Sequence, residues 1–299
     1  SPRPVAQPRG NPVTPLALVL VIAAGAFHVV WNYLAKSSED KIAFLWIING
    51  IFFVTYLPVF FLLGYSLHLP GRGWLMAGLS GLIHAGYFWT LGRAYEGGDL
   101  SLVYPLSRGS SVFLVGVLSV PLLGERLSAP GVAGVVTVLL GIFILHMRPG
   151  SWKQRLLPSR TPGAWWALIT GLTITGFSLV DKTGVGILDP VVYMYLVFFF
   201  TLIFFTPLAL KNGIAPIRTV WRRQSGRLFL LGLLMPAAYG MILFAYTLAP
   251  VAYVAAAREV RLLFGTLAGA WMLKEERTGH RLSGAGLIVA GVVLISFAG

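Results

Sequence analysis

Long apolar runs recur along almost the whole chain, and they limit the folds that it can adopt. Many of them approach the roughly 20 residues that an α-helix needs to cross the hydrocarbon core of a bilayer. Only 11% of the 299 residues are charged, compared with about 25% in soluble domains. We therefore expect an all-α membrane protein that crosses the bilayer many times.

Polar breaks divide the apolar runs into ten expected transmembrane helices. They cover residues 14–36, 42–65, 73–96, 100–123, 128–147, 163–183, 190–210, 226–248, 251–273 and 280–298. Residues 1–13 are expected to form a flexible tail, and the basic loop 148–162 separates the first five helices from the last five. The expected units are thus two five-helix repeats, at 14–147 and 163–298.

An odd number of helices in each unit means that the second unit enters the membrane from the opposite side. Weak internal similarity supports this inverted repeat, because LLGERLSAPGVAGVVTVLLGIFIL at 122–145 matches MLKEERTGHRLSGAGLIVAGVVLI at 272–295, an offset of 150. The same offset places Arg108 on Arg258. Since transporters with inverted repeats bind substrate near the midplane between the repeats, we expect two inverted five-helix repeats around a central cavity.

The charge distribution excludes several classes of protein. The formal net charge is +13, but Lys and Arg are concentrated in short loops, as in membrane proteins, and do not form a nucleic-acid footprint. The absence of cysteine excludes disulfides and thiolate chemistry. We expect no metal, no cofactor and no nucleic acid. The expected partners are the lipid bilayer and a small-molecule substrate, with the protein a monomer or weak dimer.

The Gly-rich helices 128–147 and 280–298 are expected to pack within the bundle.

Polar and aromatic side chains inside six of the helices predict a substrate chamber. These helices are 14–36, 73–96, 100–123, 163–183, 226–248 and 251–273, and the other four are expected to be an outer scaffold. The candidate substrate-binding residues are His28, Trp31, Asn32, His84, Tyr87, Tyr104, Ser107, Arg108, Ser178, Tyr239, Tyr246, Arg258 and Glu259.

Two arginines are the most informative of these candidates. Arg108 and Arg258 each lie eight residues into an expected helix, which is roughly 12 Å into the membrane at about 1.5 Å per residue. Charges at such depth are costly and mark functional pathways by default. Guanidinium groups bind carboxylate and phosphate well, so an anionic substrate group is predicted. The alternative is an ion pair with Glu259 that only holds the bundle together.

The acidic residues indicate how transport is driven. Proton-driven carriers usually titrate a carboxylate within the membrane, and here Glu259 is the only deep candidate, beside arginines. Asp181 lies near a helix end, so facilitated movement, a uniport mechanism, is expected. Glu125 and Glu275 are expected to cap the next helix in each repeat.

The stretch AYEGGDLSLVYPLSRGSSVFLVGVLSVPLLGERLSAPGVAGVVTVLLGIFIL, 94–145, resembles the drug/metabolite transporter superfamily, in particular its ten-helix EamA-type members. The resemblance extends over about 14–298 and implies export of small metabolites by alternating access, with amino-acid exporters the most similar group. It also implies a multi-pass protein of the bacterial inner membrane with cytoplasmic termini. The loop charges predict the reverse orientation.

Two alternatives are weighed against this interpretation. The first is an organic-phosphate or nucleotide-sugar carrier of the same fold, since arginines bind phosphate. The second is an intramembrane serine protease, suggested by the GxSG pattern at 78–81 and by His84. Ser80 and His84 lie one turn apart on one helix, where their side chains are not expected to meet as nucleophile and base, so we expect no enzyme.

Overall fold

The computed structural model describes residues 13–36, 40–98, 100–145, 162–264 and 279–298. Within them the structure has ten α-helices, one 3₁₀ segment and a further helical stretch at 261–264. The helices are α1 (Pro15–Lys36), α2 (Lys41–Leu62), α3 (Gly71–Gly97), α4 (Leu100–Leu123), α5 (Ala129–Leu145), α7 (Pro162–Gly184), α8 (Pro190–Ala209), α9 (Ala215–Leu248), α10 (Val251–Ala257) and α12 (Gly279–Ser296), with the 3₁₀ segment η1 at Arg258–Val260.

The all-helical prediction is confirmed, and five of these helices are long and apolar enough to cross a membrane. These spans are Ile42–Leu62, Leu102–Leu123, Pro162–Gly184, Pro190–Ala209 and Ala215–Leu248. Shorter apolar stretches occur in α1, α5 and α12. Most boundaries lie within three residues of the predicted ones, because the lengths of the apolar runs define them.

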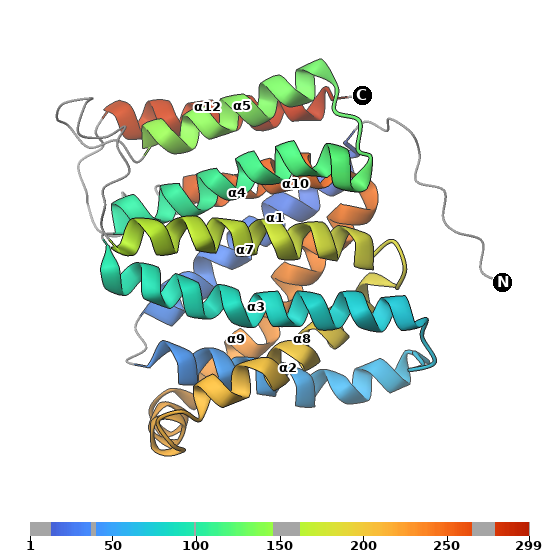
Figure 1. The fold of residues 1–299 in the computed structure, drawn as a ribbon, viewed down its shortest axis with the longest axis vertical. Helices are drawn as coiled ribbons and strands as arrows, with labels where there is room; N and C mark the ends of the chain where they lie inside the picture. Colours follow the sequence, from blue (N-terminus) through green and yellow to red (C-terminus); the bar gives the residue numbers. More distant parts are fainter. Residues whose placement is uncertain (1–12, 37–39, 99, 146–161, 265–278, 299) are drawn as a thin grey trace.

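Helices from the two halves of the chain pack against one another in reciprocal pairs. The α3 helix packs on α7 and α8, and correspondingly α9 packs on α1 and α2. The pairs α2–α8 and α5–α12 each join equivalent helices of the two halves. Figure 1 shows α5 and α12 along one edge of the molecule and α2 and α8 along the other. This reciprocity is the arrangement expected of two repeats related by a two-fold axis.

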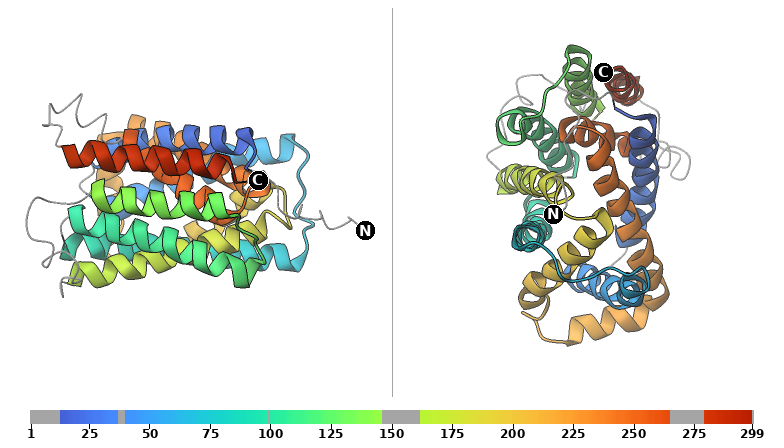
Figure 2. Two further views of the ribbon diagram at one scale, coloured as in Figure 1. Left: turned by 90° about the horizontal axis from the view of Figure 1, so that it is seen from above. Right: turned by 90° about the vertical axis from the view of Figure 1, so that its right-hand side faces the viewer.

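The α5–α12 interface depends on glycine at the contact. The two helices lie side by side at one end of the molecule (Figure 2). A Cβ added at Gly141 would lie 2.8 Å from the carbonyl oxygen of Gly284, and one added at Gly284 would lie 2.6 Å from Leu145 Cα. Only residues without a side chain allow this approach, so the Gly-rich helices pack within the bundle, as predicted.

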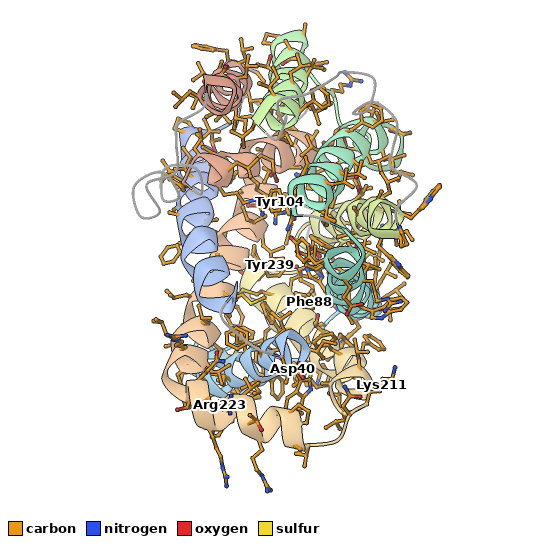
Figure 3. All side chains as sticks on the ribbon, turned by 90° about the vertical axis from the view of Figure 1, so that its left-hand side faces the viewer. Asp40, Phe88, Tyr104, Lys211, Arg223 and Tyr239 are labelled. Atoms are coloured by element: carbon orange, nitrogen blue, oxygen red, sulfur yellow. The ribbon has the colours of Figure 1, made fainter. Side chains whose placement is uncertain are left out.

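The structure differs from the predicted helix at 226–248. The helix α9 begins at Ala215 and bends at Gln224, whose φ of −135° and ψ of 19° are non-helical. Its first segment lies across the lower end of the bundle (Figure 2), with Arg223 labelled in Figure 3. Ile217 and Val220 of this segment are buried in an apolar cluster with residues of α2 and the later part of α9. Residues 215–225 were predicted to lie outside the helices. They are helical because one apolar face of this segment is buried.

The predicted helix at 251–273 is also interrupted. The α-helix ends at Ala257, the 3₁₀ segment Arg258–Val260 follows, and the part of the prediction beyond 264 lies outside the described residues. In a 3₁₀ helix, side chains three residues apart lie above one another. The tighter turn therefore aligns Arg258 with Arg261.

A glycine substitution tests the α5–α12 interface. Gly284→Ala should destabilise the protein by about 1–3 kcal/mol, because the added methyl group overlaps the backbone of α5. The measurement is the melting temperature of the detergent-purified protein, which should fall.

The matched control is Gly286→Ala on the same helix, where an added Cβ meets nothing within 4 Å. This variant should keep the melting temperature or raise it slightly, since Ala favours helix over Gly by about 1 kcal/mol. Equal effects of the two substitutions would contradict the packing account.

Candidate functional site

A cavity opens in the middle of the bundle, with a volume of about 810 Å³ that includes its opening to solvent. Tyr239 marks its place near the centre of the bundle, between Tyr104 and Phe88 (Figure 3). The lining residues are Ala24, Gly25, Asn49, His84, Tyr87, Phe88, Arg108, Phe177, Val197, Phe198, Thr201, Met235, Ala238, Tyr239, Ile242, Arg258 and Arg261.

Arg108 reaches this cavity from α4, three residues after Pro105. It is buried, and its Nη2 donates a hydrogen bond to the hydroxyl of Tyr87 at 3.0 Å. Its guanidinium group lies 5.8 Å from the ring centre of Tyr87 and 5.6 Å from that of Tyr104. These ring contacts favour the cation without neutralising it. The Nε atom of Arg108 has no hydrogen-bond partner within the described structure.

The second half of the chain contributes Arg258 and Arg261. Arg258 Nη1 donates to the hydroxyl of Tyr246 at 3.3 Å. Arg261 Nη2 lies 2.5 Å from Glu259 Oε1, and both side chains of this ion pair are buried. Glu259 thus neutralises Arg261. Across the described parts of the chain, neither Arg108 nor Arg258 has an ion pair, so the cavity keeps two uncompensated cations.

A second polar cluster surrounds Asp181, immediately behind the cavity wall. The sequence placed this carboxylate near a helix end, yet the structure buries it completely. Asp181 Oδ1 accepts hydrogen bonds from Ser80 Oγ at 2.5 Å and from the Tyr193 hydroxyl at 3.0 Å, and Oδ2 accepts one from the Tyr239 hydroxyl at 2.8 Å. His84 Nδ1 lies 2.9 Å from the carbonyl oxygen of Ser80. Asp181 is near the end of α7, and it is buried because residues of α3, α8 and α9 cover it.

Ser80 and His84 meet, contrary to the prediction, with 3.2 Å between Oγ and Nδ1. Their arrangement is still not that of a serine hydrolase. The Ser80 hydroxyl donates to Asp181, and Ser80 is fully buried rather than open to a substrate. A catalytic triad requires the histidine to lie between the serine and the aspartate. Here Ser80 instead contacts Asp181 directly.

Glu125 was predicted to cap the next helix of its own repeat, and the structure shows that it does not. Its Oε1 instead accepts a hydrogen bond of 2.6 Å from the backbone N–H of Val251, the first residue of α10. Lys182 Nζ donates to the carbonyl oxygens of Tyr246 and Ala249, at the end of α9. The carboxylate and the ammonium group thus satisfy opposite helix ends at the α9–α10 junction. The predicted cap of Glu275 lies outside the described residues.

The structure brings together five of the predicted site residues on the cavity wall: His84, Tyr87, Arg108, Tyr239 and Arg258. Three more support the arginines from behind: Tyr104, Tyr246 and Glu259. Two others are buried away from the cavity, Ser107, which donates to the carbonyl oxygen of Tyr104, and Ser178. The side chains of His28, Trp31 and Asn32 lie outside the described part of α1.

Sequence reasoning missed the contribution of two helices that it assigned to the scaffold. Asn49 of α2 and Val197, Phe198 and Thr201 of α8 line the cavity. The available signals are Asn49 and Thr201, polar residues within the apolar runs of α2 and α8. The aromatic and aliphatic residues of α8 give none, because lining residues and packing residues of this kind look alike.

This fold, with a polar cavity among apolar helices, defines a multi-pass membrane protein with an internal cavity. Comparison with known proteins shows a similarity of one part of the chain to a protein family. Residues 161–297, a little under half of the chain, match the EamA-like transporter family. No group of three or more His, Asp or Glu suited to a metal ion lies within the described residues.

Two further similarities concern a curated protein and a solved structure. A curated protein from Sinorhizobium sp, "Uncharacterized transporter in cobO 3'region", is 35% identical over 77 residues, which are 26% of this chain and 54% of that protein. The match thus spans about half the length of this relative. A solved structure titled "Crystal structure of protein" has a TM-score of 0.69, covers 93% of this chain and 94% of its own, and is 18% identical. The latter shows a shared fold over almost the whole chain.

The buried ion pair yields a stability prediction. Glu259→Gln should lower the free energy of unfolding by about 3–5 kcal/mol, because it leaves Arg261 as a third unpaired cation in the bundle. Thermal unfolding of the purified protein measures this loss.

Glu96→Gln serves as the matched control, since Glu96 pairs with Arg93 at 3.0 Å on the exposed surface. It should change stability by less than about 1 kcal/mol. A Glu259→Gln variant as stable as this control would show that Glu259 does not neutralise Arg261.

Proposed function

We propose that this protein exports small carboxylate-bearing metabolites, with amino acids that carry apolar or aromatic side chains as the substrate class. The supporting observation is the pair Arg108 and Arg258, which line one cavity without an acidic partner in the described structure. Unpaired guanidinium groups in an apolar bundle are costly, and a substrate carboxylate relieves that cost through charge-assisted hydrogen bonds.

The remainder of the cavity suits the other end of such a molecule. Phe88, Phe177, Phe198 and Met235 line it together with aliphatic residues. These side chains remove the apolar part of a substrate from water, whereas the arginines bind its carboxylate. A cavity that combines two unpaired guanidinium groups with many apolar side chains thus favours an amphipathic substrate over a polyanion, and this ranks amino acids above nucleotide sugars and organic phosphates.

Alternating access is the mechanism that we propose. The cavity takes residues from both halves of the chain, so a movement of one half against the other changes its exposure to both membrane sides. Pro105 in α4 and Pro236 in α9 provide points at which the walls can bend. The outward direction rests on the resemblance to exporters alone, since the cavity geometry is the same for either direction.

The expectation of uniport depended on a bundle with no buried carboxylate other than Glu259. Asp181 removes this premise because it is completely buried beside the cavity. Facilitated movement therefore no longer follows from the distribution of acidic residues, and the coupling must be inferred from the Asp181 cluster itself.

Counterflow in proteoliposomes tests the proposed function. Purified protein in vesicles preloaded with an unlabelled amino acid should take up the labelled one at equal pH on both sides. Arg108→Gln and Arg258→Gln should each raise the half-saturation concentration about tenfold or more, because a charge-assisted hydrogen bond contributes about 1.5–3 kcal/mol.

The control variant is Arg93→Gln, which removes an exposed guanidinium group of α3 that does not line the cavity. It should transport like the wild type. Counterflow of phosphorylated metabolites but of no amino acid would reject the proposed substrate and support an organic-phosphate or nucleotide-sugar carrier. Wild-type affinity in both arginine variants would reject the proposed site.

A further inference from the structure

The Asp181 cluster contains a buried charge that carboxylate binding does not use. Its three hydroxyl donors come from α3, α8 and α9, so they hold the carboxylate at an interface between the two halves of the chain. Hydroxyl groups stabilise the anion without neutralising it. The three donors suit the anionic form of Asp181, which is opposite in charge to the arginines of the cavity.

His84 connects this charge to the cavity. Its Nδ1 lies 2.9 Å from the carbonyl oxygen of Ser80, which can only accept a hydrogen bond, so Nδ1 carries the hydrogen atom. The lone pair of the neutral ring is then on Nε2, for which the described structure records no hydrogen bond. The ring stacks on Phe177 at 4.1 Å and lines the cavity, so Nε2 is the atom that can take a proton.

The charged and titratable groups around His84 come from several helices. They are Tyr87 of α3, Arg108 of α4, Asp181 of α7, Tyr193 of α8, Tyr239 of α9 and Arg258 of η1. Of these, Asp181 is the group that balances a positive charge at His84, and it is joined to the histidine through Ser80. The charge of Arg258 opposes a cation at His84, whereas the charge of Asp181 attracts one and has the larger effect of the two, so His84 is the place in the lining that favours an ammonium group.

We propose that His84, supported by Asp181, is the site at which the substrate's ammonium group and a proton compete, so that the protein exchanges an amino acid for a proton. This inference rests on the proposed transport of amino acids. The carboxylate binds the arginines, and the ammonium group donates a hydrogen bond to Nε2. When a proton from cavity water forms an N–H bond at Nε2, the lone pair is occupied and the charge repels the ammonium group.

Competition at one atom determines the sign of the coupling. The site binds a proton or the substrate and not both, and by linkage each lowers the affinity for the other. A carrier that changes its exposure with either occupant, but not when empty, moves the two in opposite directions. A pH gradient then drives substrate toward the more acidic compartment.

Two measurements on the proteoliposomes test this inference. In the first, substrate uptake is followed with an acidic vesicle interior, with potassium and valinomycin holding the membrane potential at zero. The wild type should concentrate substrate inside, up to about tenfold for each pH unit at one proton per substrate. In the second, the half-saturation concentration for counterflow is measured against pH, equal on both sides. It should rise as pH falls, by up to about tenfold per unit.

Substrate analogues and variants provide matched controls. A deaminated analogue, with the carboxylate but without the ammonium group, should inhibit counterflow with no such rise at low pH. His84→Gln keeps an acceptor but cannot be protonated, so it should flatten the pH dependence and abolish gradient-driven accumulation relative to its own counterflow rate. Asp181→Asn should also lose accumulation. His68→Gln, on the exposed loop between α2 and α3, should behave like the wild type.

The outcomes separate this inference from the proposed function. Wild-type counterflow of amino acids without accumulation in a pH gradient would overturn proton exchange and leave transport standing. Accumulation in the alkaline compartment, or an unchanged pH dependence in His84→Gln, would overturn it as well. Failure of counterflow with every amino acid would overturn the proposed function and this inference together.

Discussion

Charged and polar groups inside an apolar bundle must find partners within the protein, because the surrounding hydrocarbon offers none. This constraint explains most buried charges of the structure. Glu259 pairs with Arg261, Glu125 accepts the first N–H of α10, and Lys182 donates to the last carbonyl groups of α9. Against this background Arg108 stands out, since it is buried and has aromatic and hydroxyl partners but no counter-ion in the described structure.

The two halves of the chain are joined by some of the same polar contacts. Glu125 belongs to the first half and caps a helix of the second, and Ser80 of α3 donates to Asp181 of α7. Tyr253 of α10 in turn accepts the backbone N–H of Ser128, at the start of α5. These contacts form at helix ends and behind the cavity wall. Any movement that changes the exposure of the cavity must preserve or exchange them, because leaving them unmade is costly.

The sequence was informative where a feature is local and uninformative where it depends on distant residues. Apolar run lengths predicted most helix boundaries, and a charge deep in an apolar run identified Arg108 and Arg258. The depth of a residue in the membrane was counted along its own helix, however, and by this count Asp181 lies near the end of α7. Its burial comes from Ser80 and from tyrosines of α8 and α9, and nothing in residue spacing indicates that these helices cover it. The partner of Glu125 is likewise 126 residues away in sequence.

The internal repeat gives a reason why two cations remain unpaired. At the offset of 150, Arg108 corresponds to Arg258, whereas Gly109 corresponds to Glu259 and Ser111 to Arg261. At these positions the second half has one acid and one base more than the first, and the two neutralise each other as a buried ion pair. Each half therefore presents one spare guanidinium group to the same cavity. A carboxylate bound by both would bridge the two halves, and its binding energy would then depend directly on how they are placed relative to each other.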